Sequence, residues 1–150
     1  MSTPSRPTDQ PPVIKQVIKE YRFPKQEDLV QLIAPNLIVV RYGTITNNES
    51  ENTLESRWVM ETFNDIKQIS NGQLLDVLVD LSTIDSGEYN SSESNKIYRS
   101  ILGDSRVRKV AVFGLPTGWQ MLIDVLTVFV PHKLKVFSTD AAARDWLGKA

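Results

Sequence analysis

The chain has 150 residues, of which 41% are hydrophobic and 23% are charged, with a net charge of −1 and no cysteine. This length and composition predict one globular domain that buries its core without disulfides. The near-neutral charge disfavours a nucleic-acid-binding role, and the lack of cysteine excludes thiolate catalysis and cysteine-ligated metals. No segment is apolar enough over a sufficient length to cross a membrane, and we therefore expect a cytoplasmic protein.

The first 27 residues divide into a tail and an arm. Residues 1–12 contain four prolines among polar residues and predict a disordered tail. Residues 13–27 form an N-terminal arm, in which the apolar residues of 13–23 have helical spacing but β-branched side chains that also suit a strand. The preferred interpretation is a short helix or arm that packs on the domain. The alternative is an arm that mediates dimerisation or binds a partner.

Strands and helices alternate along the domain, which spans residues 28–150. The residue pattern predicts strands at 28–33, 37–45, 74–81, 107–113 and 134–137, and helices at about 46–69, 90–102, 119–130 and 140–147. The turn at 34–36, Ala-Pro-Asn, joins the first two strands as a hairpin. The prediction is therefore a single-domain α/β sandwich: a mixed, mostly parallel sheet of about five strands, an N-terminal antiparallel hairpin and four helices.

Capping residues place the ends of the first two helices. Thr46 and Asn48 are candidate N-caps of the first helix, because a glutamate follows each of them three residues later. Asn90 has the same spacing to Glu93 at the start of the second helix. The Asn71-Gly72 pair predicts a left-handed end to the first helix. That helix should turn an apolar stripe inward, with Val59, Phe63 and Ile66 at its centre and Leu54, Trp58 and Ile69 beside it.

The stretch 74–87, LLDVLVDLSTIDSG, contains the first candidate site. Its near-continuous apolar run predicts a strand covered on both faces, and the carboxyl ends of such strands face the ligand crevice in open α/β sheets. Asp80 either anchors a ligand there or accepts backbone hydrogen bonds that fix the loop, and Asp76 should pair with a lysine or arginine. The candidate crevice residues are Asp80, Ser82, Asp85 and Gly87.

The second candidate site is the predicted helix at 119–130, which is apolar almost all round. Such a helix must be covered on more than one side. The cover is either the domain and its arm, a partner or second copy of the chain, or an apolar ligand. The candidate contacts are Trp119, Met121, Leu122 and Phe129. The chain has one histidine, His132, and no spacing of residues that predicts a metal site.

Four segments in a fixed order carry a resemblance to a known family. They are RYGTIT at 41–46, VLVDLSTID at 77–85, VRKVAVFG at 107–114 and KVFSTDAAARDWL at 135–147. With these segments the chain resembles the STAS domains of anti-sigma-factor antagonists. It is most similar to a divergent branch of small bacterial STAS-like, or Sec14-like, proteins.

The resemblance implies a non-enzymatic module without a cofactor. In the antagonists, a serine in a D-S-[ST]-G turn is phosphorylated by a partner kinase, and the matching position here makes Ser86 the candidate phosphoacceptor. This chain departs from the pattern, because one hydroxyl residue precedes Gly87 and further polar residues follow before the helix. A plain turn at 85–87, with the aspartate bonding its own backbone, is the alternative.

We therefore expect a regulatory module that binds another protein, with phosphorylation of Ser86 as a means of control. The alternative is a protein that binds a small apolar or lipid-like ligand in the crevice beside the 119–130 helix. A homodimer is compatible with either function. Enzymatic activity is not expected, because no activated nucleophile or acid–base pair is evident in the sequence.

Overall fold

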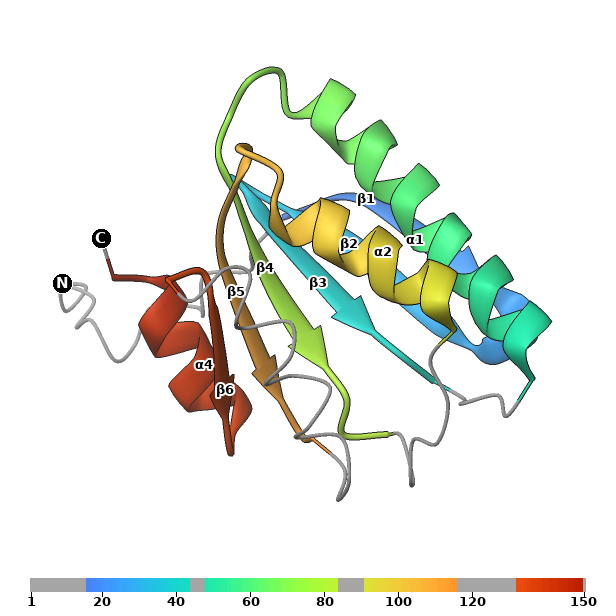
Figure 1. Ribbon diagram of the computed structural model, residues 1–150. Helices are drawn as coiled ribbons and strands as arrows, with labels where there is room; N and C mark the ends of the chain where they lie inside the picture. Colours follow the sequence, from blue (N-terminus) through green and yellow to red (C-terminus); the bar gives the residue numbers. More distant parts are fainter. Residues whose placement is uncertain (1–15, 44–47, 84–90, 116–131, 150) are drawn as a thin grey trace, which may run out of the picture.

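The computed structural model describes residues 16–43, 48–83, 91–115 and 132–149 (Figure 1). The described elements form an α/β fold around one mixed sheet of six strands, which lie in sequential order from β1 to β6. In chain order they are β1 (Val17–Phe23), the short 3-10 helix η2 (Pro24–Gln26), β2 (Asp28–Ile33), β3 (Leu37–Arg41), α1 (Glu49–Ile69), β4 (Leu75–Asp80), α2 (Ser92–Leu102), β5 (Val107–Phe113), β6 (Leu134–Phe137) and α4 (Asp140–Leu147).

The sheet is antiparallel at its N-terminal end and parallel elsewhere. Strands β1, β2 and β3 pair antiparallel, whereas β3, β4, β5 and β6 pair parallel. Helices α1 and α2 lie on one face of the sheet and α4 lies on the other (Figure 1). This arrangement confirms the predicted α/β architecture with its N-terminal hairpin.

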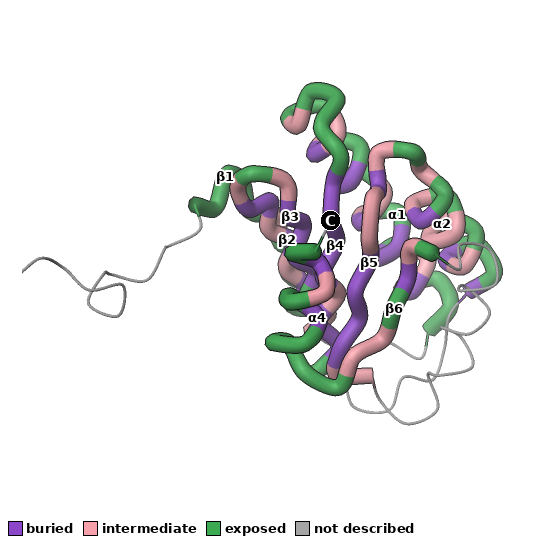
Figure 2. Tube along the Cα trace, turned by 90° about the vertical axis from the view of Figure 1, so that its left-hand side faces the viewer, coloured by how far each residue is buried: buried purple, intermediate pink, exposed green. Residues whose placement is uncertain are grey.

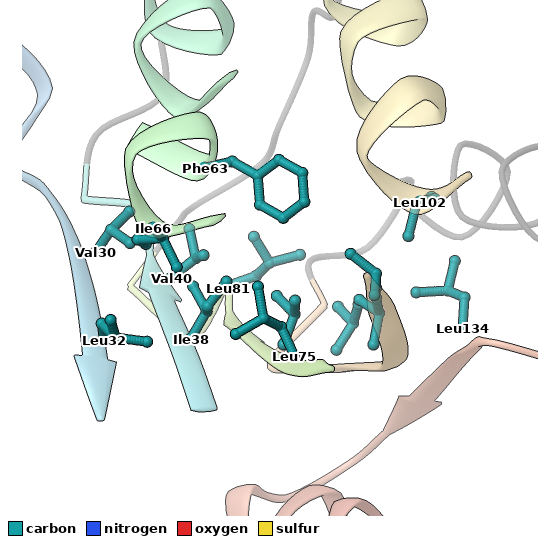
Figure 3. Packing of buried hydrophobic residues seen from close by; sticks show 14 residues of the cluster. Val30, Leu32, Ile38, Val40, Phe63, Ile66, Leu75, Leu81, Leu102 and Leu134 are labelled. Atoms are coloured by element: carbon teal, nitrogen blue, oxygen red, sulfur yellow. The ribbon is translucent and has the colours of Figure 1, made fainter. Parts of the chain in front are cut away.

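The two faces of the sheet have separate apolar cores. The larger core lies under α1 and α2, where Phe63, Ile66 and Leu102 pack with residues of the strands such as Val40 and with Leu81, which directly follows β4 (Figure 3). The smaller core lies between the sheet and α4. Its members are Ile33, Leu37, Val39, Leu78, Ala111, Phe113, Ala143 and Leu147. The central strand β4 contributes to both cores, as the apolar run of its sequence predicts.

The predicted inward stripe of α1 is correct at its centre and at Trp58, which packs against the larger core, and wrong at its other two edge residues. Val59, Phe63 and Ile66 are buried, whereas Leu54 and Ile69 are 49% and 41% exposed. The stripe is narrower than predicted, because polar residues occupy buried positions in the first half of this helix.

Capping decides where the helices begin. The Asn48 side chain accepts hydrogen bonds from the backbone N–H groups of Ser50 and Glu51, and α1 therefore begins at Glu49 in the second of the two predicted frames. Ser91, rather than Asn90, caps α2 by accepting from the N–H of Ser94. The C-terminal end of α1 has the predicted left-handed turn at residues 71–72.

The structure corrects the preferred interpretation of residues 13–23. Residues 17–23 form the edge strand β1 and not a helix, because the free edge of β2 pairs with them along their length. Alternate side chains face α1: Tyr21 donates a hydrogen bond to Asp65, and Lys19 forms an ion pair with the same carboxylate. Most of β1 is exposed, as its green and pink tube indicates (Figure 2).

The element count differs from the prediction in two places. The described residues contain six strands instead of five, because β1 adds to the sheet. They contain three α-helices instead of four, because the predicted helix at 119–130 lies outside the described residues. Strand β3 ends at Arg41, four residues before its predicted end at Ile45.

Candidate functional site

The carboxyl ends of three parallel strands meet on one side of the molecule. In the register of the sheet, Arg41 of β3 lies opposite Asp80 of β4, which lies opposite Phe113 of β5. The segments that follow these strands are therefore neighbours. We call residues 41–43, 80–83 and 113–114 the carboxyl edge. In open α/β sheets this edge is the usual place for a binding site.

Asp80 is the anchor of the carboxyl edge. Its carboxylate is buried and accepts hydrogen bonds from the backbone N–H of Ser82 at 2.8 Å, from the Ser82 hydroxyl, and from Nε of Arg41 at 3.1 Å. Burial acts to raise the pKa of Asp80, but the hydrogen bonds from Ser82 and the Arg41 charge outweigh it and lower this pKa below its usual value. Asp80 is thus a charged group that fixes the loop, which is one of its two predicted roles.

The loop after β4 is also tied to the segment after β3. The Thr83 hydroxyl donates to the backbone carbonyl of Tyr42 at 2.6 Å, and the Tyr42 N–H donates to the Asp80 carbonyl at 3.3 Å. Gly114 lies against the same loop, so closely that a Cβ atom there would be 2.6 Å from the Ser82 nitrogen. The side chains of Arg41, Ser82 and Thr83 are exposed on this fixed backbone.

Beneath the carboxyl edge lies a pair of buried acidic side chains that the sequence analysis missed. Asp28 at the start of β2 and Glu55 of α1 are 2% and 6% exposed, and their carboxyl groups hydrogen-bond with each other. Burial, together with the hydrogen bond and the charge of the neighbouring Asp28, raises the pKa of Glu55 to about 10. Burial also raises the pKa of Asp28. One proton is therefore shared by the pair at neutral pH.

A sequence signal for this pair exists. Glu55 lies four residues before Val59 and therefore falls on the inward stripe of α1. A glutamate on such a stripe predicts a buried carboxyl, but the position of its partner depends on the fold.

Two tyrosines lie next to the carboxyl pair. The Tyr42 hydroxyl, at the end of β3, donates to the Tyr98 hydroxyl of α2 at 2.8 Å. Burial raises the pKa of both tyrosines, and the charges of Glu55 and Asp28 add to this effect. Both phenols are therefore neutral hydrogen-bonding groups over the physiological range.

A hydroxyl cluster joins the beginnings of α1 and α2. The Ser94 hydroxyl lies 2.6 Å from the Asn52 side-chain oxygen and 2.6 Å from the Ser56 hydroxyl, and the Ser91 N–H donates to Asn52 at 2.7 Å. All four side chains are buried. Ser91 and Ser94 lie at the start of α2, and their contacts hold α2 against α1.

Asp76 has the basic partner that the sequence predicts. Arg108 of β5 forms two hydrogen bonds of 2.8 and 2.7 Å with its carboxylate, at the end of β4 opposite to the carboxyl edge. Arg108 also donates to the Leu147 carbonyl, so this ion pair fixes the C-terminal end of α4. Its role is structural.

The structure brings Asp80 and Ser82 together, but several predicted site residues lie outside its described part. These are Asp85, Ser86 and Gly87 of the loop, and Trp119, Met121, Leu122 and Phe129 of the apolar segment. His132 is described and exposed. Within the described ranges, no group of three or more histidine, aspartate or glutamate side chains is arranged so that it could hold a metal ion. No described helix is long and apolar enough to cross a membrane.

The fold and its carboxyl edge define a small α/β domain of the kind that the resemblance implied. The sequence profile of the SpoIIAA-like family matches residues 37–148, and the chain belongs to that family. Among solved structures, the chain is similar to an uncharacterized protein of the DUF3478 family with a SpoIIAA-like fold from Shewanella loihica PV-4. The TM-score is 0.48 at 16% identity, over 92% of this chain and 98% of that chain. No curated protein matches the sequence significantly.

Proposed function

We propose that this protein is a non-enzymatic regulatory module that binds a partner protein at its carboxyl edge. One observation carries the proposal: the exposed side chains of Arg41, Ser82 and Thr83 stand on a backbone that Asp80 and Tyr42 hold in place. A surface that is ordered before binding loses less conformational entropy when a partner docks. Membership of the SpoIIAA-like family agrees with a regulatory role.

A non-enzymatic role is supported by the place of the perturbed acidic groups. The carboxyls whose pKa values are raised, Asp28 and Glu55, lie inside the protein. Asp80, the carboxylate of the carboxyl edge, is occupied by hydrogen bonds from Ser82 and Arg41. General acid–base catalysis needs a titrating group within reach of a substrate, and neither arrangement offers one.

The binding proposal is tested with two matched arginine variants. Arg41 and Arg144 are both partly exposed and both form an ion pair, with Asp80 and Asp140 respectively. Tagged wild type, Arg41→Gln and Arg144→Gln are cross-linked in the native cells, and the attached proteins are quantified by mass spectrometry. We expect a partner, or a second copy of the chain, that Arg41→Gln captures at least about tenfold less than the other two proteins. Equal capture by both variants would contradict the proposal.

We further propose that phosphorylation of Ser86 regulates this binding. Ser86 follows Thr83 of the carboxyl edge by three residues, and it occupies the position of the phosphoacceptor in the related antagonists. A phosphate adds a charge of about −1.5 to −2, which would change the electrostatics of a surface that carries Arg41. The test is mass spectrometry of the protein purified from its own cells, together with the partner affinity of Ser86→Asp. An unmodified serine and an unchanged affinity would rule the regulation out.

A further inference from the structure

Strand β1 forms a free edge of the sheet. It pairs with β2 on one side, and in the described part of the chain no strand pairs with its other side. Figure 2 shows β1 exposed at the margin of the molecule, and Val17 and Ile18 at its start are 45% and 46% exposed. A free edge has N–H and C=O groups that can bind another strand, so β1 is a candidate interface.

The regular part of β1 is centred on Tyr21. A bulge interrupts the pairing with β2 between Val17 and Lys19, and the pairing is regular over residues 19–23. Pro24 follows directly, and it has no N–H group to donate to a neighbouring strand. A further strand can therefore pair regularly with residues 19–23, and the midpoint of this segment is Tyr21.

The charges of β1 select the same centre when the strand pairs with a second copy of itself. A two-fold axis between antiparallel strands matches residues whose side chains lie on the same face, so the axis passes through a residue position. An axis at Lys19, Glu20 or Arg22 sets that residue opposite its own copy, and like charges directly opposite each other are unfavourable. An axis at Tyr21 instead sets Glu20 opposite Arg22, and does so twice.

Glu20 and Arg22 are accessible for this pairing. They lie on the same face of β1, where Nη2 of Arg22 is 2.8 Å from Oε2 of Glu20, and their side chains are 37% and 67% exposed. Across the axis the two residues would meet their counterparts and form a network of four alternating charges. Such a network stabilises an interface more than an isolated surface ion pair does.

Helix α1 shows where an axis at Tyr21 would pass the layer above the sheet. The Tyr21 hydroxyl donates to Asp65, and the ring of Phe23 packs against Trp58 with the ring centroids 5.3 Å apart. The axis would therefore pass α1 between Trp58 and Asp65, close to residues 61 and 62.

Leu54 and Ile69 are equally far along α1 from this point, and they are its exposed large hydrophobic residues. Leu54 precedes Trp58 by four residues and Ile69 follows Asp65 by four, so all of them lie on the side of the helix that faces β1. The axis would bring Leu54 of one copy next to Ile69 of the other. A second copy would thus cover the two apolar residues of α1 that the single chain leaves exposed.

We propose that this protein is a homodimer in which the β1 strands of two copies pair antiparallel about a two-fold axis at Tyr21, with the two α1 helices side by side over the joined sheet. The interface uses no residue of the carboxyl edge. Because the strand directions are reversed across the axis, the two carboxyl edges lie at opposite ends of the joined sheet. The dimer therefore presents two separate partner sites, and its formation does not depend on partner binding.

Sedimentation equilibrium of the full chain between about 1 and about 100 μM tests the dimer. We expect the wild type to show a reversible monomer–dimer equilibrium in this range. Arg22→Glu sets two glutamates opposite each other at both symmetric positions, and it should raise the dissociation constant of the dimer at least about tenfold. The control Arg144→Glu reverses the charge of another exposed, ion-paired arginine and should leave this constant unchanged.

The charge swap that combines Glu20→Arg with Arg22→Glu tests the register. It again sets opposite charges across the axis, so most of the lost affinity should return. Tyr21→Cys gives a second readout, because the chain has no cysteine and this position meets its own copy. The Cα atoms of opposite residues in an antiparallel pair lie within the range of a disulfide, so oxidation should cross-link this variant. The control Ser105→Cys, at an exposed position far from β1, should not cross-link.

Three results would overturn the dimer: a wild type that stays monomeric up to about 100 μM, an Arg22→Glu variant that associates as tightly as the wild type, or a Tyr21→Cys variant that does not cross-link. A charge swap that regains no affinity would overturn the register. The substituted side chains of residues 20 and 22 are exposed, and circular dichroism should show the wild-type fold in these variants. Partner capture by the Arg41 variant is a separate measurement, so either proposal can fail without the other.

Discussion

Replacing Glu55 by glutamine should change how the stability of the whole protein depends on pH. The pKa of Glu55 is about 10 in the folded protein and near 4.5 in an unfolded chain. Between these values the folded state holds one proton more than the unfolded state. The free energy of unfolding therefore falls as pH rises, by about 1.4 kcal/mol per unit. From pH 6 to pH 9 the wild type should lose about 4 kcal/mol.

Other acidic groups contribute little in this range. The pKa values of Asp65, Asp80 and Asp104 are lowered by their hydrogen bonds and ion pairs. These groups are ionised in both the folded and the unfolded state above pH 6, so they add no slope there. Their stabilising effect is lost at acidic pH, as pH falls through their folded pKa values. A slope between pH 6 and pH 9 thus reports the buried pair.

The measurement is urea-induced unfolding at pH 6, 7, 8 and 9, followed by circular dichroism. Glu55→Gln keeps a side chain of the same shape that can donate a hydrogen bond to Asp28, and its stability should stay within about 1 kcal/mol over this range. Glu61→Gln is the control, because Glu61 is an exposed residue of the same helix. It should keep the wild-type slope. A flat wild-type profile, or an equal slope in Glu55→Gln, would show that the pair holds no extra proton.

Two further predictions concern the framework of the domain, one at the carboxyl edge and one at the opposite end of β4. Gly114→Ala should destabilise the protein by about 2–4 kcal/mol in urea unfolding, since Gly114 has a φ of 73° and its Cβ would collide with Ser82. The control Gly72→Ala has a similar φ of 84° but open space, and should lose only about 1–2 kcal/mol; equal losses would contradict the collision. Arg108→Met should lower thermal stability by about 2–3 kcal/mol, because it leaves the buried Asp76 carboxylate without its partner. The double variant with Asp76→Asn should recover most of this loss, and a failure to recover would contradict the explanation.

The central strands and the helix starts could be predicted because their causes are local. A nearly continuous apolar run such as residues 74–81, interrupted by Asp76 and Asp80, is typical of a strand that is buried on both faces. A short polar side chain such as Asn48 or Thr139 satisfies the free N–H groups of the helix that follows it. In both cases the residues that decide the structure are neighbours in the sequence.

The identity of β1 could not be predicted in this way. The apolar residues of this segment have helical spacing, which favoured a short helix or arm, although their β-branched side chains also suit a strand. Their choice depends on β2, whose edge offers backbone hydrogen-bonding groups along the whole length of the segment. Secondary structure at the edge of a sheet is therefore decided by pairing and not by the segment alone.

The sequence by itself determined the order of the described elements from β2 to α4, the two-sided burial of β4, the polar segment after β4 as a candidate site, and the resemblance to a regulatory family. Only the tertiary structure showed that Asp80 acts through Ser82 and Arg41, and that Asp28 lies against Glu55. The physical reason is that burial and the approach of distant charges set the ionisation of a carboxyl group. Both depend on how β2, β3 and the two helices pack, and no local pattern of residues records that packing.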